Sequence, residues 1–269
     1  MRLGFIVGVG NDPESAIRKV HDIGVPTCQV GVNNFHPEFG MQLRKALDQY
    51  GIEATSLVFG GPGPEVYDLY DGPDTIGFVP RTWRAARIQT AKKASDFARQ
   101  LGIPAIQTHC GFIPENPNDP LYKEFIETMR EVAGYCRRNE QGFRYETGQE
   151  TPITLLRAIL DVGLDNQGVN FDCGNLILYG KANPVDALDS IGKHVKGMHA
   201  KDGLYPTNPK DLGKQVPMGQ GKVDFPALIR RLKELNYLGP VTIEQEFTTS
   251  DALEELRRER AYLEKLISG

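Results

Sequence analysis

The sequence predicts an α/β protein with the fold of a (β/α)₈ TIM barrel in a single domain. Eight short apolar or β-branched runs alternate with longer segments of helical period from one end of the chain to the other. Eight units in 269 residues make about 34 residues per unit, close to the repeat of a (β/α)₈ barrel of about 250 residues. No linker or low-complexity segment divides the chain, so we expect one domain over residues 1–269.

The expected strands are short runs that a parallel sheet can bury on both faces. They cover residues 3–9, 27–32, 54–60, 105–110, 143–147, 168–173, 195–201 and 240–246. Several of the expected helices are followed by a glycine that can end a helix. These helices cover residues 13–24, 40–51, 82–102, 121–138, 152–163, 184–192, 224–237 and 251–267. Two long connections, 60–80 and 202–223, follow expected strands and therefore belong to the face where barrel active sites are built.

The composition restricts the partners and the compartment. Lys and Arg number 31 against 35 Asp and Glu, a net charge of −4, which argues against a nucleic-acid partner. No apolar run approaches the roughly 20 residues that span a membrane, and the apolar stretch at 3–9 has no cleavage-site pattern after it. The four cysteines form no Cys-x-x-Cys pair, so we expect reduced thiols in a cytoplasmic protein without a membrane partner.

Four polar side chains stand at equivalent places near the ends of the later strands: Glu146, Asp172, His199 and Glu244. Neighbouring strand ends bring such side chains together at one mouth of a barrel. Three converging carboxylates repel one another unless a cation lies between them. Three carboxylates and one imidazole suit one divalent ion, with Mn²⁺ as our first expectation and Mg²⁺, Co²⁺ or Zn²⁺ as alternatives.

Several motifs resemble the xylose isomerase-like barrels, the family of sugar phosphate isomerases and epimerases. They are Tyr-Glu-Thr-Gly-Gln-Glu at 145–150, Asp172 followed by Asn175, His-Ala-Lys-Asp at 199–202, Gly-Gln-Gly-Lys-Val-Asp-Phe at 219–225 and Gly-Pro-Val-Thr-Ile-Glu at 239–244. The resemblance implies a metal-dependent keto-sugar isomerase or epimerase that transfers a proton through a cis-enediolate. It implies Glu146, Asp172, His199 and Glu244 as the metal ligands, and Glu146 and Glu244 as the catalytic base and acid.

Five further residues are candidates for binding a small sugar or polyol: His109, Glu150, Asn175, Lys201 and Asp202. Each has a plainer alternative. His109 could be a structural histidine, and Glu150 could favour the start of the helix that follows it. Lys201 could form an ion pair with Asp202 or Glu244, and Asp202 could orient the imidazole of His199. Family members often have a histidine where this chain has Asn175, and an amide cannot shuttle a proton at neutral pH.

Three rival functions follow from the same residues. A trinuclear abasic-site endonuclease needs histidines after the third strand and at position 175, where this chain has Phe59-Gly60 and Asn175. A dehydratase of an inosose-like ketone could use the same metal ligands with one added acid. A non-catalytic sugar-binding barrel would lose a ligand, and none of the four is lost here. No glycine-rich phosphate cradle follows the last two strands, which favours an unphosphorylated substrate. A homo-oligomer is compatible with the sequence.

Overall fold

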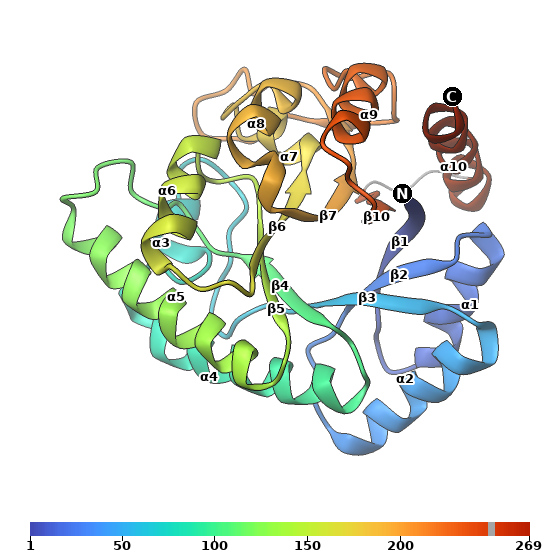
Figure 1. Ribbon diagram of the computed structural model, residues 1–269, viewed down its shortest axis with the longest axis horizontal. Helices are drawn as coiled ribbons and strands as arrows, with labels where there is room; N and C mark the ends of the chain where they lie inside the picture. The colour runs from blue at the N-terminus through green and yellow to red at the C-terminus, as the bar shows by residue number, and fades with distance from the viewer. Residues whose placement is uncertain (247–250) are drawn as a thin grey trace.

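The computed structural model describes residues 1–246 and 251–269. Its eight long strands are parallel and form a closed barrel in the order β1-β10-β7-β6-β5-β4-β3-β2. Figure 1 shows helices around this barrel, with the first strand, in blue, beside the last, in red. The predicted (β/α)₈ fold is confirmed.

The barrel strands lie close to their predicted positions. They are β1 (Arg2–Gly8), β2 (Thr27–Gly31), β3 (Glu53–Val58), β4 (Ala105–His109), β5 (Gly142–Glu146), β6 (Gln167–Asp172), β7 (Val195–Ala200) and β10 (Pro240–Ile243). The prediction was wrong at the end of the last strand, which we expected to reach residue 246. The ladder stops at Ile243 because the side chain of Gln215 binds the backbone beyond it: its Nε2 donates to the carbonyl of Glu244 (2.9 Å) and its Oε1 accepts from the amide of Glu246 (3.0 Å).

Eight helices match the predicted helical segments. They are α1 (Pro13–Ile23), α2 (Pro37–Tyr50), α4 (Arg81–Gln100), α5 (Pro120–Arg138), α6 (Pro152–Val162), α8 (Pro184–Ile191), α9 (Phe225–Glu234) and α10 (Ala252–Ser268). Proline occupies the first turn of six of these helices, where its missing N–H is no loss. Helix α2 begins before the predicted residue 40 for this reason, since Pro37 is preorganised for a helix start.

The structure also has short elements that the sequence did not predict, some of them within the long connections. They are α3 (Gly72–Thr75), α7 (Cys173–Leu178), a 3₁₀ helix at Gly192–His194 and the antiparallel pair β8 (Asp202–Gly203) and β9 (Gln215–Val216). Helix α7 follows β6 without a gap, so Cys173 begins a helix and does not continue the predicted strand. Asp172 caps this helix by accepting from the amide of Asn175 at 2.7 Å.

Alternate residues of each strand face two different environments. The outward side chains, such as Val30 and Leu57, pack against helices in an apolar core, and the four cysteines are buried free thiols. The inward side chains beneath the barrel mouth are polar, and Gln29, Gln107 and Asn170 have no exposed surface. Within the described residues, no helix is both long and apolar enough to cross a membrane.

Candidate metal centre

The ends of four strands bring the predicted metal ligands together. Glu146 and Asp172 are the last residues of β5 and β6, His199 is the penultimate residue of β7, and Glu244 follows β10 directly. The strand register places His199 beside both Asp172 and Thr242. One oxygen or nitrogen atom from each of the four ligands lies within 4.8 Å of the others. The predicted convergence of these side chains is therefore confirmed.

The imidazole of His199 lies at the centre of this cluster. Its Nδ1 is 3.1 Å from Glu244 Oε2, 3.2 Å from Glu146 Oε1 and 3.4 Å from Asp172 Oδ2. His199 Nδ1 and Asp172 Oδ2 are buried and have no hydrogen-bond partner. Buried polar atoms without partners are costly, and these two point at the same small volume. Three carboxylate oxygens and one nitrogen match the ligands that Mn²⁺ and Mg²⁺ take in proteins, so the residues fit a divalent ion.

Burial and charge act against each other in this cluster. Burial opposes the ionisation of Glu244, but Lys201 and His199 hold its pKa well below the usual range. Burial also opposes protonation of His199, but Glu244 and Glu146 raise its pKa well above the ordinary value. Burial raises the pKa of Asp172 to about 6. A dry cluster of carboxylates is a strong binding site for a cation.

Lys201 is buried against the acidic cluster. Its Nζ lies 2.7 Å from Glu246 Oε1, 3.1 Å from Glu244 Oε2 and 3.7 Å from Asp172 Oδ2. The predicted alternative of an ion pair with Glu244 is thus observed. The Glu246 side chain is 61% exposed against 11% for Glu244, which supports Glu244 as the ligand. One ammonium and one divalent ion together would balance the three cluster carboxylates.

The prediction that Asp202 orients His199 was wrong. The Asp202 carboxylate accepts hydrogen bonds from four backbone amides in its own connection, those of Gly203, Gly219, Gly221 and Val223. The connection folds back so that these N–H groups surround one buried carboxylate, which leaves no oxygen for the imidazole. Asp202 therefore holds the 202–223 segment in place.

Gln29 supplies the oxygen that faces His199. Its Oε1 lies 2.5 Å from Nε2 of His199 and accepts from Nε2 of Gln107 at 2.8 Å. Neither glutamine was predicted from the sequence. The available signal was a long amide at the middle of each of two short strands, Thr-Cys-Gln-Val-Gly and Ala-Ile-Gln-Thr-His.

His109 joins the cluster from β4. Its Nε2 lies 3.5 Å from Glu146 Oε1, and its Nδ1 lies 3.1 Å from Nε2 of Gln149. The amide of Gln149 also lies 3.0 Å from the hydroxyl of Tyr179. Nε2 of His109 thus faces Glu146 and the space beside it.

A hollow of about 450 Å³ opens above the cluster, within the range of about 300–1,000 Å³ typical of small-molecule sites. Of the five predicted substrate-binding residues, His109 and Asn175 line it, whereas Glu150, Lys201 and Asp202 do not. Glu150 is buried behind the mouth, where desolvation raises its pKa to about 8. The lining from β1, β2 and β3 is mostly apolar: Ile6, Val32, Val58 and Phe59, with one polar side chain, Asn33.

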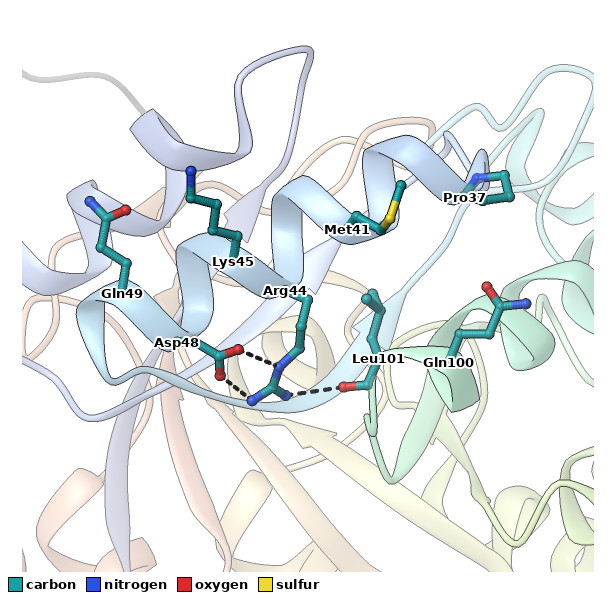
Figure 2. Close-up of a pocket in the computed structure, with 9 residues that line it drawn as sticks. Pro37, Met41, Arg44, Lys45, Asp48, Gln49, Gln100 and Leu101 are labelled. Carbon is teal, nitrogen blue, oxygen red and sulfur yellow. Dashed lines mark hydrogen bonds and ion pairs between the residues drawn. The ribbon is translucent and has the colours of Figure 1, made fainter.

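A second hollow, of about 760 Å³, lies on the outside of the barrel between α2 and the end of α4. Figure 2 shows Met41, Lys45 and Gln49 along α2, and the guanidinium of Arg44 bound by Asp48 and by the carbonyl of Leu101. This groove contains none of the strand-end residues. Its charged groups are already paired or extend into solvent, so the chemistry belongs to the barrel mouth.

The chain belongs to the xylose isomerase-like TIM barrel family, whose sequence model matches residues 17–266. The crystal structure of a xylose isomerase domain protein from Planctomyces limnophilus is similar over 100% of this chain and 96% of that chain, with 33% identity and a TM-score of 0.90.

Two further comparisons concern proteins with a stated activity or ligand. L-ribulose-5-phosphate 3-epimerase UlaE from Escherichia coli is 28% identical over 199 residues, 67% of this chain and 63% of the epimerase. A xylose isomerase-like TIM barrel protein from Mycobacterium smegmatis, solved in complex with magnesium, has 21% identity and a TM-score of 0.72 over 95% of this chain and 88% of that one. The chain spans 63% to 64% of the length of the first curated relatives that it matches.

Proposed function

We propose that this protein is a divalent-metal-dependent epimerase or isomerase of an unphosphorylated ketose. The observation that carries the proposal is the convergence of Glu146, Asp172, His199 and Glu244 within 4.8 Å, with two buried ligand atoms that have no other partner. The similarity to L-ribulose-5-phosphate 3-epimerase supports the epimerase reaction, and the preference for an unphosphorylated substrate comes from the lining of the hollow alone. The magnesium complex of a protein with the same fold supports the metal, and Mn²⁺ or Mg²⁺ is the ion that the ligand set favours.

The four cluster residues would hold the metal. When bound, it would attract electrons from substrate oxygens and stabilise the negative charge that develops as a proton leaves the neighbouring carbon.

The proton itself is moved by the protein. Glu146 and Glu244 reach the cluster from strands on different sides of the mouth, β5 and β10, so their carboxylates can act on opposite faces of a flat substrate. One carboxylate takes the proton and the other returns one. Return to the same carbon inverts it, and return to the neighbouring carbon isomerises the sugar. Nε2 of His109 lies where it can contact either the Glu146 carboxylate or a substrate oxygen.

The walls of the hollow support a neutral sugar. Its lining residues, all within 1–246, include no lysine or arginine, which are the side chains that usually bind a phosphate. The one buried ammonium nearby belongs to Lys201 and is occupied by three carboxylates. The apolar wall suits the C–H face of a sugar, because contact there excludes water from the reacting carbon.

Deuterium exchange tests this function directly. The protein with added Mn²⁺ is incubated in D₂O with ketopentoses and ketohexoses and with their phosphate esters, and NMR follows deuterium at the carbon beside the carbonyl. We expect exchange with at least one free ketose, none after chelation, and a loss of at least about 1,000-fold in Glu146→Gln. Exchange that survives chelation would refute the metal-dependent mechanism. A preference for phosphate esters would refute the substrate class.

A further inference from the structure

The two ring nitrogens of His199 lie in different surroundings. Nδ1 faces the carboxylates of Glu146, Asp172 and Glu244. Nε2 points the other way, into the barrel, where Gln29 Oε1 lies 2.5 Å away. A metal ligand nitrogen must offer a lone pair, and a neutral imidazole carries its hydrogen on the other nitrogen. Nδ1 can therefore serve as the ligand only if Nε2 keeps its hydrogen.

A buried chain of hydrogen bonds orients the amide of Gln29. Ser56 Oγ donates to Gln107 Oε1 at 2.7 Å, Gln107 Nε2 donates to Gln29 Oε1 at 2.8 Å, and Gln29 Nε2 donates to Asn170 Oδ1 at 3.0 Å. Among these four side chains, Nδ2 of Asn170 is a buried donor without a hydrogen-bond partner. All four side chains have no exposed surface, so water cannot take the place of any member. The amide oxygen of Gln29 is thus held toward His199.

We propose that Gln29 is a positioning residue that fixes the tautomer of His199, so that Nε2 carries the hydrogen and Nδ1 is presented to the metal. This inference rests on the proposed metal-dependent function and extends it to a residue that touches neither metal nor substrate. Partners of metal-bound imidazoles are usually carboxylates, backbone carbonyls or waters. Here an amide takes that place, which adds no further negative charge beneath a cluster of three carboxylates.

The alternative is that Gln29 only fills the barrel interior. Gln107 is the matched control, because it is equally buried and belongs to the same chain of hydrogen bonds. It donates to Gln29, and its own Nε2 is 3.5 Å from the His199 ring. Removing its amide disturbs the packing and the network, but Gln29 Nε2 still donates to Asn170, which keeps the Gln29 oxygen beside His199.

The experiment measures the dissociation constant of Mn²⁺ by electron paramagnetic resonance for four full-length proteins: wild type, Gln29→Met, Gln29→Glu and Gln107→Met. Methionine has a similar length and no strong acceptor, so we expect Gln29→Met to bind Mn²⁺ about 10- to 100-fold more weakly. Glutamate keeps an acceptor, and Asn170 can turn its unpartnered Nδ2 toward it. We therefore expect Gln29→Glu and Gln107→Met to stay within about threefold of wild type, well short of that loss.

Each other result overturns the inference. Wild-type affinity in Gln29→Met would show that the oxygen is not needed. Equal weakening in Gln29→Met and Gln107→Met would show a general effect of the core, and a Gln29→Glu protein as weak as Gln29→Met would exclude an acceptor role. Absence of Mn²⁺ binding by wild type would instead refute the proposed metal centre itself.

A measurement on the wild type covers the case in which Gln29→Met does not fold. In ¹⁵N-histidine-labelled protein loaded with Zn²⁺, we expect NMR to show a hydrogen on Nε2 of His199 and none on Nδ1. A hydrogen on Nδ1, or none on Nε2, would overturn the inference without any variant.

Discussion

The two walls of the barrel mouth differ in chemistry although the same kind of strand end builds both. The wall from β1, β2 and β3 carries Ile6, Val32, Val58 and Phe59, whereas the wall from β5, β6, β7 and β10 carries the acidic cluster. A site that binds a cation needs charged groups that converge on one point. A surface that contacts the substrate needs only a complementary shape and the exclusion of water. The proposed reaction therefore depends on the half of the barrel that carries the cluster, and we propose that the other half seats the substrate.

The largest expected effect comes from removing one acid and sparing its neighbour. Glu244→Gln keeps the shape of the side chain and removes a ligand. We expect Mn²⁺ binding to weaken at least about 100-fold and the exchange rate to fall about 1,000-fold, equal to about 4 kcal/mol. Isothermal titration with Mn²⁺ and the deuterium assay measure the two losses.

Glu246→Gln is the control for that experiment. Glu246 binds Lys201 but is largely exposed, and exposed ion pairs contribute little. We expect less than about a threefold change in Mn²⁺ affinity, in line with an exposed pair worth under about 1 kcal/mol. A larger loss in Glu246→Gln than in Glu244→Gln would exchange the roles of the two residues.

Glu150→Gln tests whether a buried carboxylate outside the cluster also affects stability and Mn²⁺ binding. Desolvation raises the pKa of Glu150 to about 8, above the unfolded value of about 4.3. Stability from the bound proton is therefore complete below about pH 4 and is lost as the pH rises toward 8. We expect Glu150→Gln to be more stable than wild type by about 4 kcal/mol at pH 8 and equal to it at pH 4, as measured by urea unfolding.

The affinity for Mn²⁺ distinguishes the role of Glu150 from that of the four cluster residues. We expect Glu150→Gln to bind Mn²⁺ as wild type does. An equal gain in stability at both pH values would show that burial of this carboxyl does not oppose its ionisation.

The smallest expected effect belongs to the apolar wall. Val58→Thr keeps the shape of the half-buried side chain at the end of β3 and places a hydroxyl in the mouth. We expect the KM for the ketose to change less than about tenfold, about 1 kcal/mol, because one hydroxyl alters an apolar contact only modestly. Mn²⁺ affinity should not change. A loss of Mn²⁺ binding in Val58→Thr would show that the two walls do not have separate roles.

The fold and the convergence of the four cluster residues could be predicted from the sequence because both depend on a repeated pattern. Each βα unit brings one strand end to the mouth, so Glu146, Asp172 and His199 recur about one unit apart. Equivalent places in a repeat become neighbours in a barrel whatever the surrounding side chains are. Helices longer than two turns were found for the same reason, since their period shows over many residues.

The rest of the site could not be predicted, because its signals are not periodic. Asp202 lies three residues after His199 in the sequence. Its partners are backbone amides of Gly219 and Gly221, which reach it only because the connection folds back. Gln29 lies 170 residues from His199 in sequence, and a glutamine inside a strand has no pattern that predicts its partner. The last strand ends early because the side chain of Gln215 replaces a neighbouring strand there, which no local propensity encodes.

The closure of the barrel between its first and last strands has a consequence for biosynthesis. Strand β10 lies between β7 and β1, and Glu244 follows it. A growing chain on the ribosome thus contains three of the four ligands long before the fourth, and the open edges of β1 and β7 remain unpaired until β10 inserts. Completion of the metal centre and sealing of the barrel are one event. An ion held by all four side chains would stabilise the closed state, so metal retention would report that the chain has been made at least as far as Glu244 and that the barrel has closed.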